Sequence, residues 1–307
     1  MLLATLPATH LAAFESVANE SMFGACRVNT GIRSPHSAEK ILEIVSSKIG
    51  KDRTIVDLKG RQLRIVKWAV PTYGDIILNH KISLDLSYPA EIVFRGSDRS
   101  NIVAIDGNRI YVDPYPREAV GAGQAVNVHG HNLEICGYLT KEDKKYIKAA
   151  VKLGLHKYML SFVEQLSDIE ELLALDPDAE IYLKIESPKG LEFVTIEFPL
   201  LSVKARLVAA LDDMFINIGD DKTEIFNALD LIINRDPEAI AASRILTSLE
   251  TSEIVSMQDL LSLRYLESIG YRSFMLSDGL CSKTAAFDRA VRVLKQYFER
   301  KNIINPA

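Results

Sequence analysis

The chain has 307 residues, of which 48% are hydrophobic and 25% are charged, so it is neither a disordered nor a fibrous protein. Its length fits about two average domains, or one α/β barrel that carries an insertion. The formal net charge of −5 argues against a nucleic-acid-binding surface along the chain, but it allows a small basic pocket for an anionic metabolite.

The first 65 residues alternate strand and helix patterns. Strands are predicted at residues 2–6, 24–29 and 54–57. A short helix is predicted at 10–19, and a longer one by the apolar positions Ile41, Leu42, Ile44, Val45 and Ile49. Strands separated by helices are typical of parallel βαβ units.

The pattern changes at residues 67–133, where short β-like runs follow one another. Turn signals such as Asp106-Gly107-Asn108 separate these runs, and no helical period of useful length appears. The sequence therefore predicts a small all-β domain, inserted after the third strand.

Strand and helix patterns alternate again from residue 134 to the end. Helices are predicted at 140–153, 168–175, 222–233, 258–269 and 285–300, and strands at 157–162, 181–185, 214–218, 240–242 and 273–276. Three strands before the insertion and five after it predict an α/β fold, a TIM (β/α)8 barrel formed by residues 1–66 and 134–307.

Functional residues of such a barrel lie where strands end. Glu186 and Asp220 follow two of the predicted strands and can together hold one Mg²⁺. Lys184 precedes Glu186 by two residues, so both side chains point the same way and either serve catalysis or form a simple ion pair. Arg27 and Arg64 can clamp a phosphate or carboxylate, or form salt bridges between loops.

Nine short segments, in order along nearly the whole chain, resemble motifs of the pyruvate kinase family. Leu183-Lys184-Ile185-Glu186 is similar to the family's SKIEN, and residues 57–64 (DLKGRQLR) are similar to DTKGPEIR. The others are residues 5–9, 27–29, 139–143, 161–163, 218–220, 242–248 and 274–277. The resemblance implies a catalytic barrel with a shortened lid at residues 67–133, without the family's C-terminal regulatory domain.

The resemblance also implies roles for single residues. Lys184, Arg27, Arg64 and Ser243 would be catalytic, and Glu186 with Asp220 would ligate Mg²⁺ or Mn²⁺. The substrate would be bound by Gly219, Asp220, Ser161 and Ser277, and a monovalent cation by Asn29 and Asp57.

Several positions depart from the family pattern. Gly31 stands where the family has a serine that ligates the monovalent cation, which argues against a K⁺ site. Leu58 and Ile218 replace a threonine and an arginine, and Asp278-Gly279-Leu280 replaces the family's Gly-Glu-Thr after Ser277. The enolate end of the site is therefore better kept than the nucleotide end.

Three functions remain open on this basis. The first is Mg²⁺-dependent phosphoryl transfer between a phosphoenolpyruvate or pyruvate type of substrate and a nucleotide. The second is a Mg²⁺-dependent lyase or aldolase acting through a pyruvate enolate, and the third is a non-catalytic metabolite-binding relative. The sequence further predicts a small-molecule substrate, a homo-oligomer, no nucleic-acid or membrane partner and, from three widely spaced cysteines and no signal peptide, a cytoplasmic location.

Overall fold

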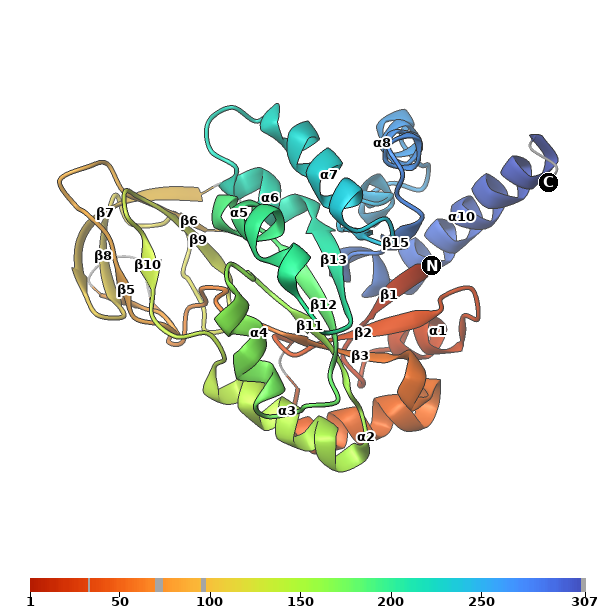
Figure 1. The fold of residues 1–307 in the computed structure, drawn as a ribbon, viewed down its shortest axis with the longest axis horizontal. Helices are drawn as coiled ribbons and strands as arrows, with labels where there is room; N and C mark the ends of the chain where they lie inside the picture. The colour runs from red at the N-terminus through yellow and green to blue at the C-terminus, as the bar shows by residue number, and fades with distance from the viewer. Residues whose placement is uncertain (33, 70–73, 95–97, 305–307) are drawn as a thin grey trace.

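Eight parallel strands form a closed barrel in the computed structural model, which describes residues 1–32, 34–69, 74–94 and 98–304 (Figure 1). The strands follow one another around the barrel in chain order, and the last one, β15, pairs with β1. The predicted α/β barrel is confirmed. The barrel strands are β1 (Leu2–Leu6), β2 (Ala25–Asn29), β3 (Thr54–Leu58), β11 (Lys157–Leu160), β12 (Glu180–Ile185), β13 (Ala205–Ala210), β14 (Ile240–Ala242) and β15 (Ser273–Met275).

The helices surround the barrel and cover its strands on the outside (Figure 1). Buried apolar side chains of strands and helices form one large core between the two layers. The helices are α1 (Ala13–Asn19), α2 (Ala38–Ile49), α3 (Lys141–Leu153), α4 (Leu166–Leu173), α5 (Pro188–Ile196), α6 (Leu211–Asn217), α7 (Glu224–Arg235), α8 (Met257–Ser268), α9 (Asp278–Cys281) and α10 (Thr284–Ile304). Among the described residues, no helix combines the length and the apolar character that crossing a bilayer requires.

The sixth barrel strand lies earlier than the sequence predicts. Residues 214–218 belong mostly to helix α6, and the strand is β13, eight residues upstream of the predicted end. The prediction was wrong because a short apolar run such as 214–218 fits a strand and a buried helix equally well. The correction moves the end of strand six from Ile218 to Ala210, directly before the first turn of α6, where Asp212 and Asp213 lie.

Between β3 and α3 the chain forms two small antiparallel sheets with a separate apolar core. Figure 1 shows this inserted segment at one end of the molecule, opposite α10. It is joined to the barrel side by Asn217 of α6, whose Nδ2 donates to Asn127 Oδ1 at 3.4 Å and to the Glu186 carbonyl at 2.9 Å. Its strands are β4 (Ile76–Ile77), β5 (Ile82–Ser83), β6 (Glu91–Phe94), β7 (Asp98–Asp106), β8 (Arg109–Asp113), β9 (Val126–His129) and β10 (Glu134–Ile135).

The barrel interior decides which side chains reach its open end. Ala25, Ile55 and Tyr182 belong to a buried apolar cluster inside the barrel. Because side chains alternate along a strand, the residue two positions later points into the interior as well. The polar residues two positions beyond members of this cluster therefore lie at the carboxyl ends of the strands: Thr5, Arg27, Asp57, Ser161, Lys184, Arg244 and Ser277.

The buried carboxylate of Asp143 ties α3 to the loop after β3. It accepts hydrogen bonds from the backbone N–H groups of Lys59 (2.8 Å), Gly60 (3.2 Å) and Thr140 (2.9 Å). We expect Asp143→Ala to lower the free energy of unfolding by about 2 kcal/mol, because three buried donors lose their acceptor. Urea unfolding measures this loss. An unchanged midpoint would show that the loop is held by other contacts.

Candidate active site

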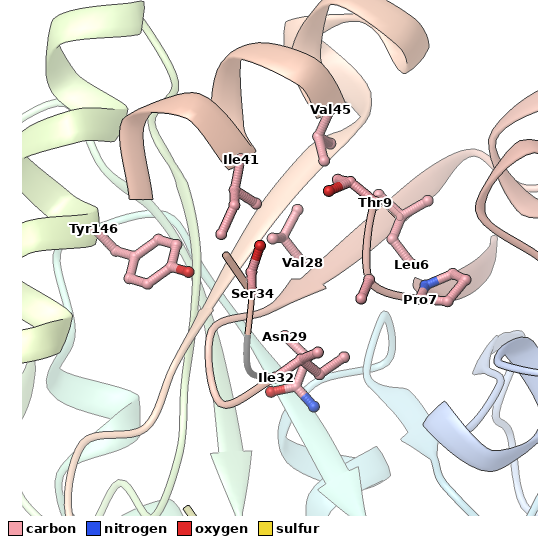
Figure 2. A pocket seen from close by; sticks show the side chains of 11 residues that line it. Leu6, Pro7, Thr9, Val28, Asn29, Ile32, Ser34, Ile41, Val45 and Tyr146 are labelled. Atoms are coloured by element: carbon pink, nitrogen blue, oxygen red, sulfur yellow. The ribbon is translucent and has the colours of Figure 1, made fainter. Parts of the chain in front are cut away.

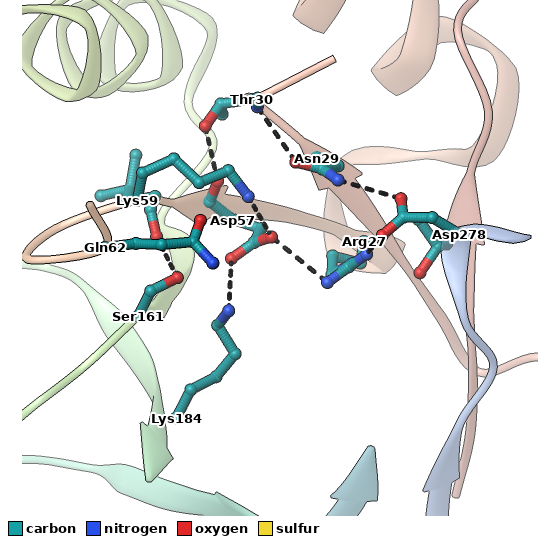
Figure 3. A network of polar contacts seen from close by, with 12 residues as sticks. Arg27, Asn29, Thr30, Asp57, Lys59, Gln62, Ser161, Lys184 and Asp278 are labelled. Carbon is teal, nitrogen blue, oxygen red and sulfur yellow. Dashed lines mark hydrogen bonds and ion pairs between the residues drawn. The ribbon is translucent and has the colours of Figure 1, made fainter. Parts of the chain in front are cut away.

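Asp57 lies at the centre of a buried polar cluster at the open end of the barrel (Figure 3). Its Oδ2 is 2.7 Å from Lys59 Nζ and 3.3 Å from Arg27 NH1, and its Oδ1 is 3.6 Å from Lys184 Nζ. Three cations from three strand ends thus share one fully buried carboxylate. Clustered positive charges of this kind create a local potential that attracts anions.

Burial and neighbouring charges oppose each other at this cluster. Burial alone would raise the pKa of Asp57, but Lys184, Lys59 and Arg27 outweigh it and lower that pKa. Burial lowers the pKa of Lys59 to about 8 against the pull of Asp57, and Arg64, Lys184 and Arg27 add to the lowering. Lys59 is therefore the cation of the cluster that loses its proton most readily.

Lys184 and Glu186 point the same way from β12, as their spacing predicts. Lys184 Nζ donates to Glu186 Oε1 at 3.1 Å, and Glu186 Oε2 accepts from the backbone N–H of Phe162 at 2.6 Å. Burial raises the pKa of Glu186 to about 7, with Lys184 opposing this rise and the charge of Asp213 adding to it. Asp213 also acts on Lys184, so a second carboxylate stands within electrostatic range of the pair.

Arg27 is held between two carboxylates. One terminal nitrogen faces Asp57, and the other forms a very short contact with Asp278 Oδ2. Asp278 Oδ1 accepts from Asn29 Nδ2 at 3.0 Å, so the same side chain also engages a predicted cation ligand. Burial alone would lower the pKa of Arg27, but Asp278 and Asp57 raise it.

Arg64 lies at the junction with the inserted segment. It donates to Gln62 Oε1 at 3.0 and 2.7 Å and to the Gly123 carbonyl at 2.7 Å. A Cβ on Gly31 would lie 2.6 Å from Arg64 NH1, so a serine there would displace this arginine. The departure at Gly31 and the position of Arg64 are therefore parts of one arrangement.

The predicted serines lie at strand ends, where the loops engage their hydroxyls. Ser161 Oγ donates to the Leu58 carbonyl at 2.8 Å, and Ser277 Oγ donates to Glu250 Oε1 at 2.6 Å. Ser243 Oγ accepts from the Asp212 N–H at 3.1 Å, and the backbone of Ser243 has a φ of 60°. A non-glycine residue with a positive φ is uncommon, and such residues often lie at functional sites.

The resemblance implied that Gly219 and Asp220 lie at a strand end, but they do not. They follow α6 in an exposed stretch, and the charge of Asp220 acts on His129 of the inserted segment. The structure therefore does not place either of them at the end of a barrel strand. Asp213 stands there instead, because the true strand six ends just before it.

Two cavities lie beside the cluster, along the loop that follows β2. The larger has a volume of about 540 Å³ and is lined by residues of that loop, α2 and α3, among them Ile32, His36 and Tyr146. The smaller, of about 20 Å³, has room for one water (Figure 2). Asn29 lines the smaller cavity, and Thr30, whose Oγ1 donates to the Asp57 carbonyl at 2.7 Å, lines the larger one. Both cavities therefore lie next to the polar cluster.

The structure brings four of the predicted site residues into one network: Arg27, Asp57, Lys184 and Glu186. Sequence reasoning gave no role to Lys59, Asp213 or Asp278. Lys59 and Asp278 are polar residues at the ends of predicted strands, and this position is the sequence signal that points to them. Asp213 was hidden by the misplaced strand.

Comparisons with known proteins agree with this architecture. No model of a known protein family matches the sequence. A pyruvate kinase of Thermoplasma acidophilum is 28% identical over 185 residues, which cover 54% of this chain and 33% of that protein. The match thus spans about a third of the relative's length.

The fold has a close counterpart among solved structures. The crystal structure of pyruvate kinase from Pyrobaculum aerophilum superposes with a TM-score of 0.69 at 18% identity, covering 96% of this chain and 72% of that one. The similarity therefore includes the inserted segment as well as the barrel. Taken with the sequence match, it supports a relationship between this chain and the pyruvate kinases.

Proposed function

We propose that this protein catalyses Mg²⁺-dependent phosphoryl transfer between a phosphoenolpyruvate or pyruvate type of substrate and a nucleotide. The observation that carries the proposal is the cluster of Arg27, Lys59 and Lys184 around Asp57, next to Glu186. Phosphoryl transfer needs little covalent help from the protein, and cations placed around the transferring group supply most of the catalysis.

The donor set at Glu186 fits a divalent metal. Glu186 and Asp213 offer hard oxygen ligands, and the charge of Asp213 raises the pKa of Glu186 when no cation is bound. A bound Mg²⁺ would neutralise charge on the reacting oxygens. Lys184 would hold its proton and place a fixed positive charge beside the transferring phosphoryl group, since Asp57 and Glu186 raise its pKa against burial.

The larger cavity supports a second substrate. Its volume of about 540 Å³ lies within the range of roughly 300–1,000 Å³ that small-molecule sites have. Tyr146 and Ile32 offer an apolar surface for a base, and Lys145, which pairs with Glu142 at 2.7 Å, offers a cation. A nucleotide there would direct its phosphates toward Asn29 and the cluster.

Enolate chemistry without a nucleotide is the second candidate, favoured by the well-kept Lys184 and Glu186 pair. Proton NMR of pyruvate in D₂O with Mg²⁺ separates enolate chemistry from simple binding. Both enzymatic candidates predict that the protein speeds the exchange of methyl protons for deuterium. Exchange at the rate of a protein-free control would favour the non-catalytic relative.

We expect the affinity for Mg²⁺ to rise with pH and to level off above about pH 7. The pKa of Glu186 is raised to about 7 without metal, so below that pH a proton occupies the carboxyl that the metal needs. The slope approaches about tenfold per pH unit well below the pKa. Calorimetric titrations at pH 6, 7 and 8 measure it. Equal affinity at all three values would remove Glu186 from the metal site.

A further inference from the structure

The carboxylate of Asp278 pairs with Arg27, the cation that a phosphorylated ligand would need. The side chain of Arg27 is buried, with 10% of its surface exposed, and its two terminal nitrogens face the carboxylates of Asp57 and Asp278. Asp57 is fully buried, whereas the Asp278 side chain is 45% exposed. Of the two carboxylates, only Asp278 has an open route to solvent.

The backbone around Asp278, the first residue of α9, is itself fixed. Ser277 Oγ accepts from the Leu280 N–H at 3.2 Å and donates to Glu250 Oε1 at 2.6 Å. A Cβ on Gly279 would lie 2.3 Å from Glu250 Oε2, so the backbone packs tightly there. Displacement of the Asp278 carboxylate therefore requires rotation of one side chain and no loop movement.

We propose that Asp278 is a built-in anion that competes with the phosphate of an incoming ligand for Arg27. Asp278 thereby sets how strongly phosphorylated ligands bind relative to unphosphorylated ones. A ligand that reaches Arg27 must first displace the carboxylate, and its affinity falls by the fraction of time that Arg27 is free. A ligand that lacks the phosphate binds without this cost. The inference rests on the proposed function, because it takes the phosphate to bind at Arg27.

The test is a set of calorimetric titrations with inorganic phosphate, phosphoenolpyruvate and pyruvate, each in the presence of Mg²⁺. Asp278→Asn keeps the shape of the side chain and removes its charge. If the carboxylate holds Arg27 about nine-tenths of the time, the variant binds phosphate and phosphoenolpyruvate about tenfold more tightly. Its affinity for pyruvate stays within about twofold of the wild type.

Glu238→Gln is the matched control. Glu238 also pairs with an arginine, Arg206 at 2.9 Å, but next to the amino ends of the barrel strands. This variant is expected to bind all three ligands as the wild type does. Asp278→Ser repeats the test with a smaller neutral side chain, should Asp278→Asn unfold.

Two results would overturn the inference: unchanged affinity for phosphate and phosphoenolpyruvate, or an equal gain for pyruvate. The proposed function is tested separately, by turnover. If the wild type turns over phosphoenolpyruvate and Asp278→Asn leaves both phosphate affinities unchanged, the function stands and the competition falls. If no turnover is found but phosphate binds more tightly to the variant, the competition stands alone.

Discussion

Lys184→Met should reduce phosphoryl transfer by about 10²–10³-fold, with the fold intact. The ammonium group is the buried cation that contacts both Asp57 and Glu186, and methionine keeps the length of the side chain without its charge. Loss of one preorganised charge at a transition state typically has this size of effect. Steady-state rates at saturating substrate and Mg²⁺ measure it.

Lys204→Met is the control for this substitution. Lys204 also pairs with a glutamate, Glu180 at 3.5 Å, but it is mostly exposed and lies before β13, at the other end of the barrel. Its turnover and its melting temperature should match the wild type. A Lys184→Met protein that melts normally and keeps full activity would remove Lys184 from the catalytic machinery.

Asp213→Asn should weaken Mg²⁺ binding by on the order of 100-fold, whereas Asp220→Asn should leave it unchanged. Asp213 follows strand six as the structure has it, whereas Asp220 follows strand six as the sequence predicted it. Asp213 acts electrostatically on Glu186 and Lys184, but Asp220 lies in the exposed stretch after α6. Titration of each variant with Mg²⁺, followed calorimetrically, measures the two effects.

The reverse result would contradict the structure. If Asp220→Asn lowered the affinity for Mg²⁺ and Asp213→Asn did not, the loop after α6 would have to fold back to Glu186. Both variants should keep the melting temperature within a few degrees, because neither side chain is part of the buried core. The comparison therefore reports on the metal and not on folding.

Most of the barrel was readable from the sequence because its strands are short apolar runs between amphipathic helices. The first three strands and the return into the barrel at Thr140 were found within a few residues, and Thr140 caps α3 as predicted. The prediction of strand six failed because the sequence of β13, with its alanines at 205, 209 and 210, favours a strand less than the apolar run of α6 does. Local sequence cannot decide which of two adjacent apolar runs lines the barrel.

The candidate site was predictable where side-chain alternation fixes direction, and unpredictable where loops decide. Lys184 lies in β12 and Glu186 directly follows it, so their spacing alone placed both at the open end. The contact between Arg27 and Asp278 joins residues that are 251 positions apart, and nothing in the local sequence of either residue predicts it. The same holds for Gly31 and Arg64, whose close approach appears only in three dimensions.

The most direct test of phosphoryl transfer is a ³¹P NMR time course. Wild-type protein is mixed with phosphoenolpyruvate and Mg²⁺, with and without a panel of nucleoside diphosphates, and Lys184→Met is run alongside. The account predicts that a nucleoside triphosphate forms only when a diphosphate is present, and that the variant forms it at least about 10²-fold more slowly. Phosphoenolpyruvate that persists with every diphosphate would contradict the proposed function.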